Sequence, residues 1–78
     1  MHAVLLGKVH RNGTSRAGKP YDFTACSVSY SAFGVEGVQV SEVLVDSRMI
    51  QFDALKIGDH YDFDYDSKGN LLNVFIED

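Results

Sequence analysis

The most regular alternation of apolar and polar positions in the chain lies in residues 60–66. Three aromatic residues and three aspartates take turns there: Tyr61, Phe63 and Tyr65, with Asp62, Asp64 and Asp66 between them. Because successive side chains of a strand point to opposite faces of its sheet, this segment is predicted to be a strand with an aromatic and an acidic face. The SKGN sequence at 67–70 predicts a hairpin turn, with residues 71–76 as the returning strand.

Three earlier segments also have strand-like patterns. Residues 3–10 are an apolar run in which Gly7 predicts a bulge or bend. Residues 21–30 are rich in β-branched and aromatic side chains, and Pro20 is expected at the start of that strand because it lacks a backbone donor. Residues 38–45 alternate imperfectly, with two predicted faces: Val38, Val40, Glu42 and Leu44 on one, and Gln39, Ser41, Val43 and Val45 on the other.

Five short strands with hairpin spacing predict an all-β protein, a small five-stranded OB-type barrel formed by one domain over residues 1–78. The turn-rich residues 11–19 predict a long, protruding loop in the first hairpin. Residues 47–55 have apolar positions spaced loosely enough for either a short helix or an extended strand.

The length and composition limit the ways in which this fold is stabilised. A chain of 78 residues with a single cysteine, Cys26, has no internal disulfide and a thin core, so oligomerisation is expected. No run of eighteen apolar residues and no signal-peptide pattern is present, which predicts a cytoplasmic protein without a membrane partner.

The charge is distributed unevenly along the chain. The first twenty residues contain four of the seven basic side chains (Lys8, Arg11, Arg16 and Lys19) and no acid, whereas the other 58 contain three basic and eleven acidic ones. The net charge of −4 argues against a protein that coats nucleic acid through a generally basic surface. The local excess of cations predicts instead a confined anion-binding site on an acidic body.

Residues 11–23, RNGTSRAGKPYDF, combine these cations with glycines and two aromatic rings. Cations neutralise phosphates, and the flat rings of Tyr21 and Phe23 offer faces on which unpaired bases stack. Glycine allows such a loop to lie close to another backbone. The combination predicts binding of a single-stranded nucleic acid without strong sequence preference.

This segment resembles the DNA-binding wing of the single-stranded DNA-binding proteins of filamentous bacteriophages, the gene V type. The wing pattern Arg-x-Gly-x-Ser-Arg-x-Gly-Lys-Pro-Tyr is met at eight positions: Arg11, Gly13, Ser15, Arg16, Gly18, Lys19, Pro20 and Tyr21. A shorter likeness links residues 55–58 (LKIG) to an aromatic-Lys-Val-Gly stretch of the family. The specific resemblance covers roughly a quarter of the chain.

The resemblance implies an OB-type barrel, a two-fold homodimer, and cooperative coating of single-stranded phage DNA during replication. It implies that Arg11 and Arg16 contact phosphates and that Tyr21 stacks on a base. Phe23 stands where the family has an apolar wing residue that touches DNA. Leu55 replaces an aromatic residue that, in the family, reaches DNA from the neighbouring subunit.

Other chemistry has little support in the sequence. The aspartates of residues 62–66 suit a solvated face better than a metal site. Successive residues on one face of a strand lie roughly 6–7 Å apart, which is too far for their carboxylates to converge on one ion. The three histidines have no ligand spacing and no Cys-x-x-Cys pair exists, so no metal or other cofactor is expected. Cys26 lies in an apolar segment, and Thr14 and Ser15 have no nucleophile motif, so no enzymatic activity is expected.

Two functions therefore stay open. The first is a single-stranded nucleic-acid-binding protein of phage or prophage replication, with DNA as the expected ligand and RNA as the alternative. The second is a small adaptor that binds protein through an exposed strand edge or the apolar residues 38–45.

Overall fold

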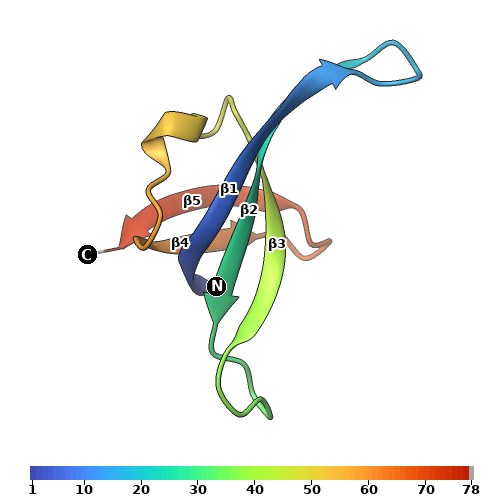
Figure 1. Cartoon of the computed structure of the whole chain (residues 1–78). Helices are drawn as coiled ribbons and strands as arrows, with labels where there is room; N and C mark the ends of the chain where they lie inside the picture. The colour runs from blue at the N-terminus through green and yellow to red at the C-terminus, as the bar shows by residue number, and fades with distance from the viewer. Residues whose placement is uncertain (78) are drawn as a thin grey trace.

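The computed structural model describes residues 1–77, which form a five-stranded antiparallel sheet (Figure 1). Its elements are β1 (His2–Thr14), β2 (Pro20–Tyr30), β3 (Gln39–Asp46), η1 (Phe52–Ala54), β4 (His60–Tyr65) and β5 (Leu71–Glu77). The strands lie in the order β3-β2-β1-β4-β5, which places β1 at the centre. The all-β prediction is confirmed. Within residues 1–77, β3 and β5 do not pair with each other, so the sheet is open and no closed barrel is formed.

The core forms because the sheet bends. In Figure 1 the β4–β5 hairpin runs across the direction of β1, β2 and β3. Tyr61 and Phe63 of β4 thereby join Val43 and Val45 of β3 in one buried cluster, although two strands separate them in the sheet. The alternation in residues 60–64 and the buried face of β3 therefore agree with the sequence pattern.

Tyr65 lies nearer the surface than the other two aromatic residues of β4, with a side chain that is 40% exposed. Its partner across the β4–β5 ladder is Leu71, which packs against the core cluster, so the predicted aromatic face continues to Tyr65. The register shift between Asp64 and Tyr65 places the extra residue, Leu72, in β5 and not in β4.

Asp66 has a local structural role in the turn that follows. Its carboxylate accepts hydrogen bonds from the backbone N–H groups of Asn70 and Lys68, both at 2.9 Å. These bonds, that of Asn70 first, lower the pKa of the Asp66 carboxyl. Gly69 completes the predicted SKGN turn with a φ of 84°.

The first hairpin extends beyond the rest of the sheet. Residues 12–14 pair only with residues 20–22, because the pairing of β2 with β3 begins at Phe23. Figure 1 shows this hairpin projecting from the body of the molecule. Residues 11–14 were predicted as loop and are strand, so the connecting turn is shorter than expected. The predicted protrusion is present, as is a register shift in β1 next to Gly7.

The ambiguous segment 47–55 is mostly irregular. It contains one turn of 3-10 helix, η1, and otherwise follows the surface. Within residues 1–77 no helix has both the length and the apolar character that crossing a membrane requires.

Thr24 of β2 is the one buried polar side chain among residues 1–77, and its Oγ1 has no hydrogen-bond partner there. A buried hydroxyl without a partner destabilises a fold, because it loses its bonds to water. We expect Thr24→Val, which removes the hydroxyl at similar volume, to raise the free energy of unfolding by about 1 kcal/mol. Urea denaturation would measure it.

Thr14→Val is the matched control, since Thr14 is exposed on the same hairpin. Its effect is expected to stay within about 0.5 kcal/mol. A loss of stability in Thr24→Val would contradict the prediction and show that the hydroxyl is bonded in solution.

Candidate nucleic-acid interface

One face of the protruding hairpin brings the two rings of the wing-like segment together with Arg11. Arg11 of β1 lies opposite Phe23 of β2, and Gly13 lies opposite Tyr21. Directly opposed residues of an antiparallel pair project to the same face, with Cβ atoms about 4.5–5.5 Å apart. We call the face that carries these four residues the ring face.

The two rings of the ring face lie against each other. The centroids of Tyr21 and Phe23 are 5.8 Å apart, with an angle of 38° between the ring planes. The Tyr21 side chain is 43% exposed, whereas Phe23 is half-buried. Tyr21 therefore presents an accessible aromatic surface that its neighbour supports from the side.

Gly13 determines the position of the Tyr21 ring. A Cβ atom at residue 13 would lie 2.8 Å from Tyr21 Oη and 3.1 Å from Tyr21 Cζ. Both distances are too short for an unperturbed contact, so any side chain here requires the tyrosine to move. Glycine thus allows the phenol to lie flat over the backbone of β1.

The turn at the tip of the hairpin carries Arg16 and Lys19. Its backbone is fixed by the N–H of Ser15 donating to the carbonyl of Lys19 at 2.8 Å, and by the N–H of Gly18 donating to the carbonyl of Ser15 at 2.9 Å. Gly18 has a φ of 79°, a conformation that favours glycine.

The charged groups of the hairpin are available to an external anion. Within residues 1–77, the side chains of Arg11, Arg16 and Lys19 take part in none of the ion pairs. All three residues are exposed. Their charges are therefore not compensated by the acidic part of the chain through direct contact.

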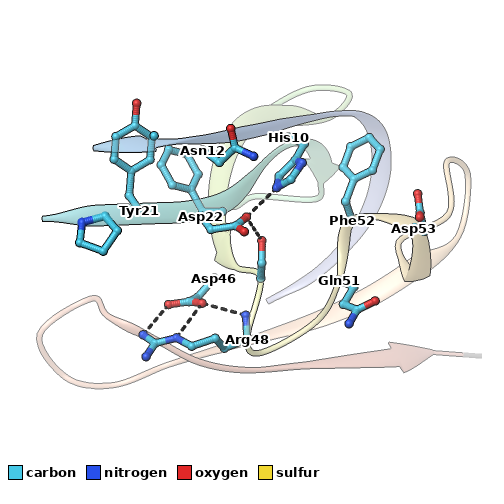
Figure 2. Close-up of a pocket in the computed structure, with 13 residues that line it drawn as sticks. His10, Asn12, Tyr21, Asp22, Asp46, Arg48, Gln51, Phe52 and Asp53 are labelled. Carbon is cyan, nitrogen blue, oxygen red and sulfur yellow. Dashed lines mark hydrogen bonds and ion pairs between the residues drawn. The ribbon is translucent and has the colours of Figure 1, made fainter. Parts of the chain in front are cut away.

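The opposite face of the hairpin is polar and acidic. Asp22 accepts hydrogen bonds from Ser47 Oγ and from His10 Nε2, each at 2.6 Å (Figure 2). These bonds, that of Ser47 first, lower the pKa of the Asp22 carboxyl and keep it ionised. A phosphate would be repelled from this face, so the two faces of the hairpin differ in what they accept.

Lys8 lies on this second face and not on the ring face. Its Nζ donates to the carbonyl of Phe52 at 2.7 Å and lies 3.9 Å from the centroid of the Phe52 ring. The ring of His10 stacks on that of Phe52, with the two centroids 5.8 Å apart. The ammonium of Lys8 thus holds η1 against β1 and is not part of the ring face.

Leu55 requires a correction. The likeness at residues 55–58 placed it among the nucleic-acid-binding residues, but its side chain is 0% exposed. It belongs to the core cluster with Tyr61, whose hydroxyl accepts a hydrogen bond from the N–H of Lys56 at 2.8 Å. An apolar side chain buried in this way has no surface to offer to DNA.

A cleft of about 1110 Å³ lies beside the hairpin, between β2 and the segment that follows β3 (Figure 2). Both hairpin rings and the ring of Phe52 line it, together with Asp46 and Arg48. The guanidinium of Arg48 donates to Asp46 at 2.9 and 3.2 Å, which lowers the pKa of Asp46. The cleft therefore offers aromatic surface, and its walls also carry the carboxylates of Asp22 and Asp53.

The sequence did not point to His10, Ser47 or Phe52 as neighbours of the wing-like segment. Ser47 and Phe52 are 25 and 44 residues away from their partners Asp22 and Lys8. No local spacing identifies such contacts, because the fold of β3 onto β2 creates them.

Cys26 has no features of a nucleophile. It is fully buried, and burial raises the pKa of its thiol to about 11. Since the thiolate is the reactive form, the side chain stays protonated at neutral pH.

Comparisons with known proteins identify no relative. No protein-family model matches the chain, and no curated protein or solved structure matches it.

Proposed function

We propose that this protein binds single-stranded DNA without strong sequence preference and has no catalytic activity. Arg11, Arg16 and Lys19 bind phosphates, and Tyr21 stacks on an unpaired base with Phe23 beside it. The role that fits this binding mode is protection of single-stranded DNA during replication of a phage or prophage in the bacterial cytoplasm.

A single observation carries the proposal. Arg11 shares one exposed face of a projecting hairpin with Tyr21 and Phe23, and none of the hairpin cations is paired internally within the described part of the chain. Cations next to accessible rings are the recurrent means of holding single strands. A solvated hairpin tip would explain the cations but not a 43% exposed tyrosine held over a glycine.

The charge distribution determines the path of the strand. The phosphates follow the ring face and the tip, where the cations are unpaired, and stay away from Asp22 on the other face. The bases turn towards Tyr21 and Phe23 at the mouth of the cleft. Stacking on one ring contributes about 1–3 kcal/mol, and an aromatic face accepts every base, which accounts for the tolerance of sequence.

We also propose that the sheet is a partly open OB-type barrel that acts as a homodimer. Both edge strands expose apolar side chains: Val40 and Leu44 on β3, and Leu72, Phe75 and Ile76 on β5. A second copy that covers one of these edges would bury apolar surface and protect unpaired backbone groups.

A fluorescence-polarisation titration of labelled oligo(dT) and of a duplex of equal length tests the proposed function. We expect the single strand to bind at least about tenfold more tightly, because paired bases are not free to stack. The slope of log affinity against log salt should be about −0.7 for each phosphate bound. Absence of oligo(dT) binding at low salt would refute the proposal.

The second candidate is a protein-binding adaptor without affinity for nucleic acid. It is favoured by the exposed apolar residues of β3 and by the acidic body of the molecule. Light scattering after size exclusion, with and without oligo(dT), separates the two functions. A nuclease-insensitive complex with protein and no oligo(dT) binding would favour the adaptor.

A further inference from the structure

Four side chains with metal-ligating groups project from the same face of the sheet, at the start of β1. His2 of β1 lies opposite Asp62 of β4, and His60 of β4 lies opposite Glu77 of β5. Their neighbours Ala3 and Tyr61 are buried on the other face. Because opposed residues share a face, these four groups project to the same side of three adjacent strands.

Three of these groups converge closely. One ligand atom from each of His2, Asp62 and Glu77 lies within 4.8 Å of the other two. His2 Nδ1 is in direct contact with Glu77 Oε1, although β4 lies between their strands. The side chains of His2 and Glu77 thus reach over β4 towards Asp62.

We propose that His2, Asp62 and Glu77 form a binding site for a divalent transition-metal ion, with Zn²⁺ as the expected occupant. Zinc binds imidazole nitrogen and carboxylate oxygen at about 2.0–2.2 Å, which places tetrahedral ligand atoms roughly 3.3–3.6 Å apart. Small side-chain rotations are sufficient to bring three atoms from within 4.8 Å of one another to that spacing. Water completes the coordination.

The donor set of the cluster suits a cation. Two carboxylates and one imidazole nitrogen converge in it. Asp62 Oδ1 is also ion-paired with the N-terminal ammonium of Met1 at 3.1 Å, so Glu77 is the carboxylate whose charge only His2 can offset. An imidazole among the ligands favours zinc over magnesium or calcium, which prefer oxygen alone.

The site is open to solvent on one side and shielded on the other. The His2 side chain is 75% exposed and that of Glu77 is 30% exposed. An ion can therefore enter without rearrangement of the backbone, while the carboxylate that holds it is partly removed from water. Partial desolvation strengthens the attraction between the ion and its ligands.

Such an ion would strengthen the shortest strand pairing of the sheet, that of β1 with β4. The pairing of β1 with β4 comprises three residue pairs, from His2 with Asp62 to Val4 with His60. A metal bound by β1, β4 and β5 at once ties the β4–β5 hairpin to the rest of the sheet. The site lies at the end of β1 opposite to the hairpin tip, so the inference does not rest on the proposed DNA binding.

Isothermal titration of the untagged chain with ZnCl₂, after treatment with a chelator, tests the proposal. We expect one zinc ion to bind per chain, with affinity about tenfold or more lower in His2→Ala and in Glu77→Gln, since each loses one ligand. Asp64→Asn is the matched control, because Asp64 lies on the same strand as Asp62 but outside the cluster. Its affinity for zinc should be unchanged.

A thermal melt gives a second readout. Zinc at about a hundredfold excess over its dissociation constant should raise the melting temperature of the natural chain by at least about 5 °C, and that of Glu77→Gln by much less. The proposal is overturned if the natural chain does not bind zinc. It is overturned equally if both cluster variants bind zinc as the natural chain does.

Discussion

Replacing Arg11 and Arg16 together by alanine is expected to weaken oligo(dT) binding by at least about a hundredfold at low salt. Each guanidinium loses a charge-assisted contact of about 1.5–3 kcal/mol with a phosphate. Neither side chain has an internal ion pair within residues 1–77, so the fold loses nothing comparable. Polarisation titrations at several salt concentrations measure the change.

The salt dependence should change together with the affinity. The slope of log affinity against log salt is expected to become less steep by about 1.4, that is, about 0.7 for each lost phosphate contact. Lys68→Ala is the matched control, since Lys68 is an exposed cation on the distant β4–β5 turn. Equal losses in the control and the double variant would mean that overall charge, and not the hairpin, binds the strand.

The strands were predictable where one face of the sheet is buried and the other is solvated. The alternation around Tyr61 and Phe63 identified a strand and its core face, because burial on one side enforces a period of two. The pattern did not reveal that β5 carries an extra residue, Leu72, in its pairing with β4, or that Tyr65 is 40% exposed. A change of register leaves no local mark in the composition of a short strand.

The candidate site was predictable in part. The cations and rings of the first hairpin are adjacent in the sequence, and a hairpin keeps such neighbours together in space. The division of the hairpin into a ring face and an acidic face depends on which residues oppose each other. That register places Arg11 beside Phe23 and sends Lys8 to the other face, where Phe52 holds it.

Long-range contacts account for what the sequence left out. Leu55 was assigned from a short local likeness, whereas its burial results from the bend that brings β4 over the central strands. The cluster of His2, Asp62 and Glu77 has the same origin, since its members come from both ends of the described chain. Spacing along the sequence cannot reveal ligands that only the strand order brings together.

Gly13→Val is expected to weaken oligo(dT) binding about as much as Tyr21→Ala, by roughly 1–3 kcal/mol or about five- to 150-fold. The reason is steric: a Cβ at residue 13 would lie 2.8 Å from Tyr21 Oη, so the ring must leave its position over β1. Tyr21→Phe should bind almost normally, because stacking requires the ring and not the hydroxyl. Gly7→Ala is the matched control, since a Cβ there meets no atom within 4 Å.

A double-mutant cycle separates this steric effect from damage to the hairpin backbone. If Gly13 acts by positioning the ring, Gly13→Val has little further effect on DNA affinity once Tyr21 is alanine. If the valine acts by distorting the hairpin, the two losses add, because Arg11 and Arg16 are then displaced as well. Additive losses would therefore contradict the positioning role of Gly13, whereas a strong coupling energy would identify the glycine and the tyrosine as one functional unit.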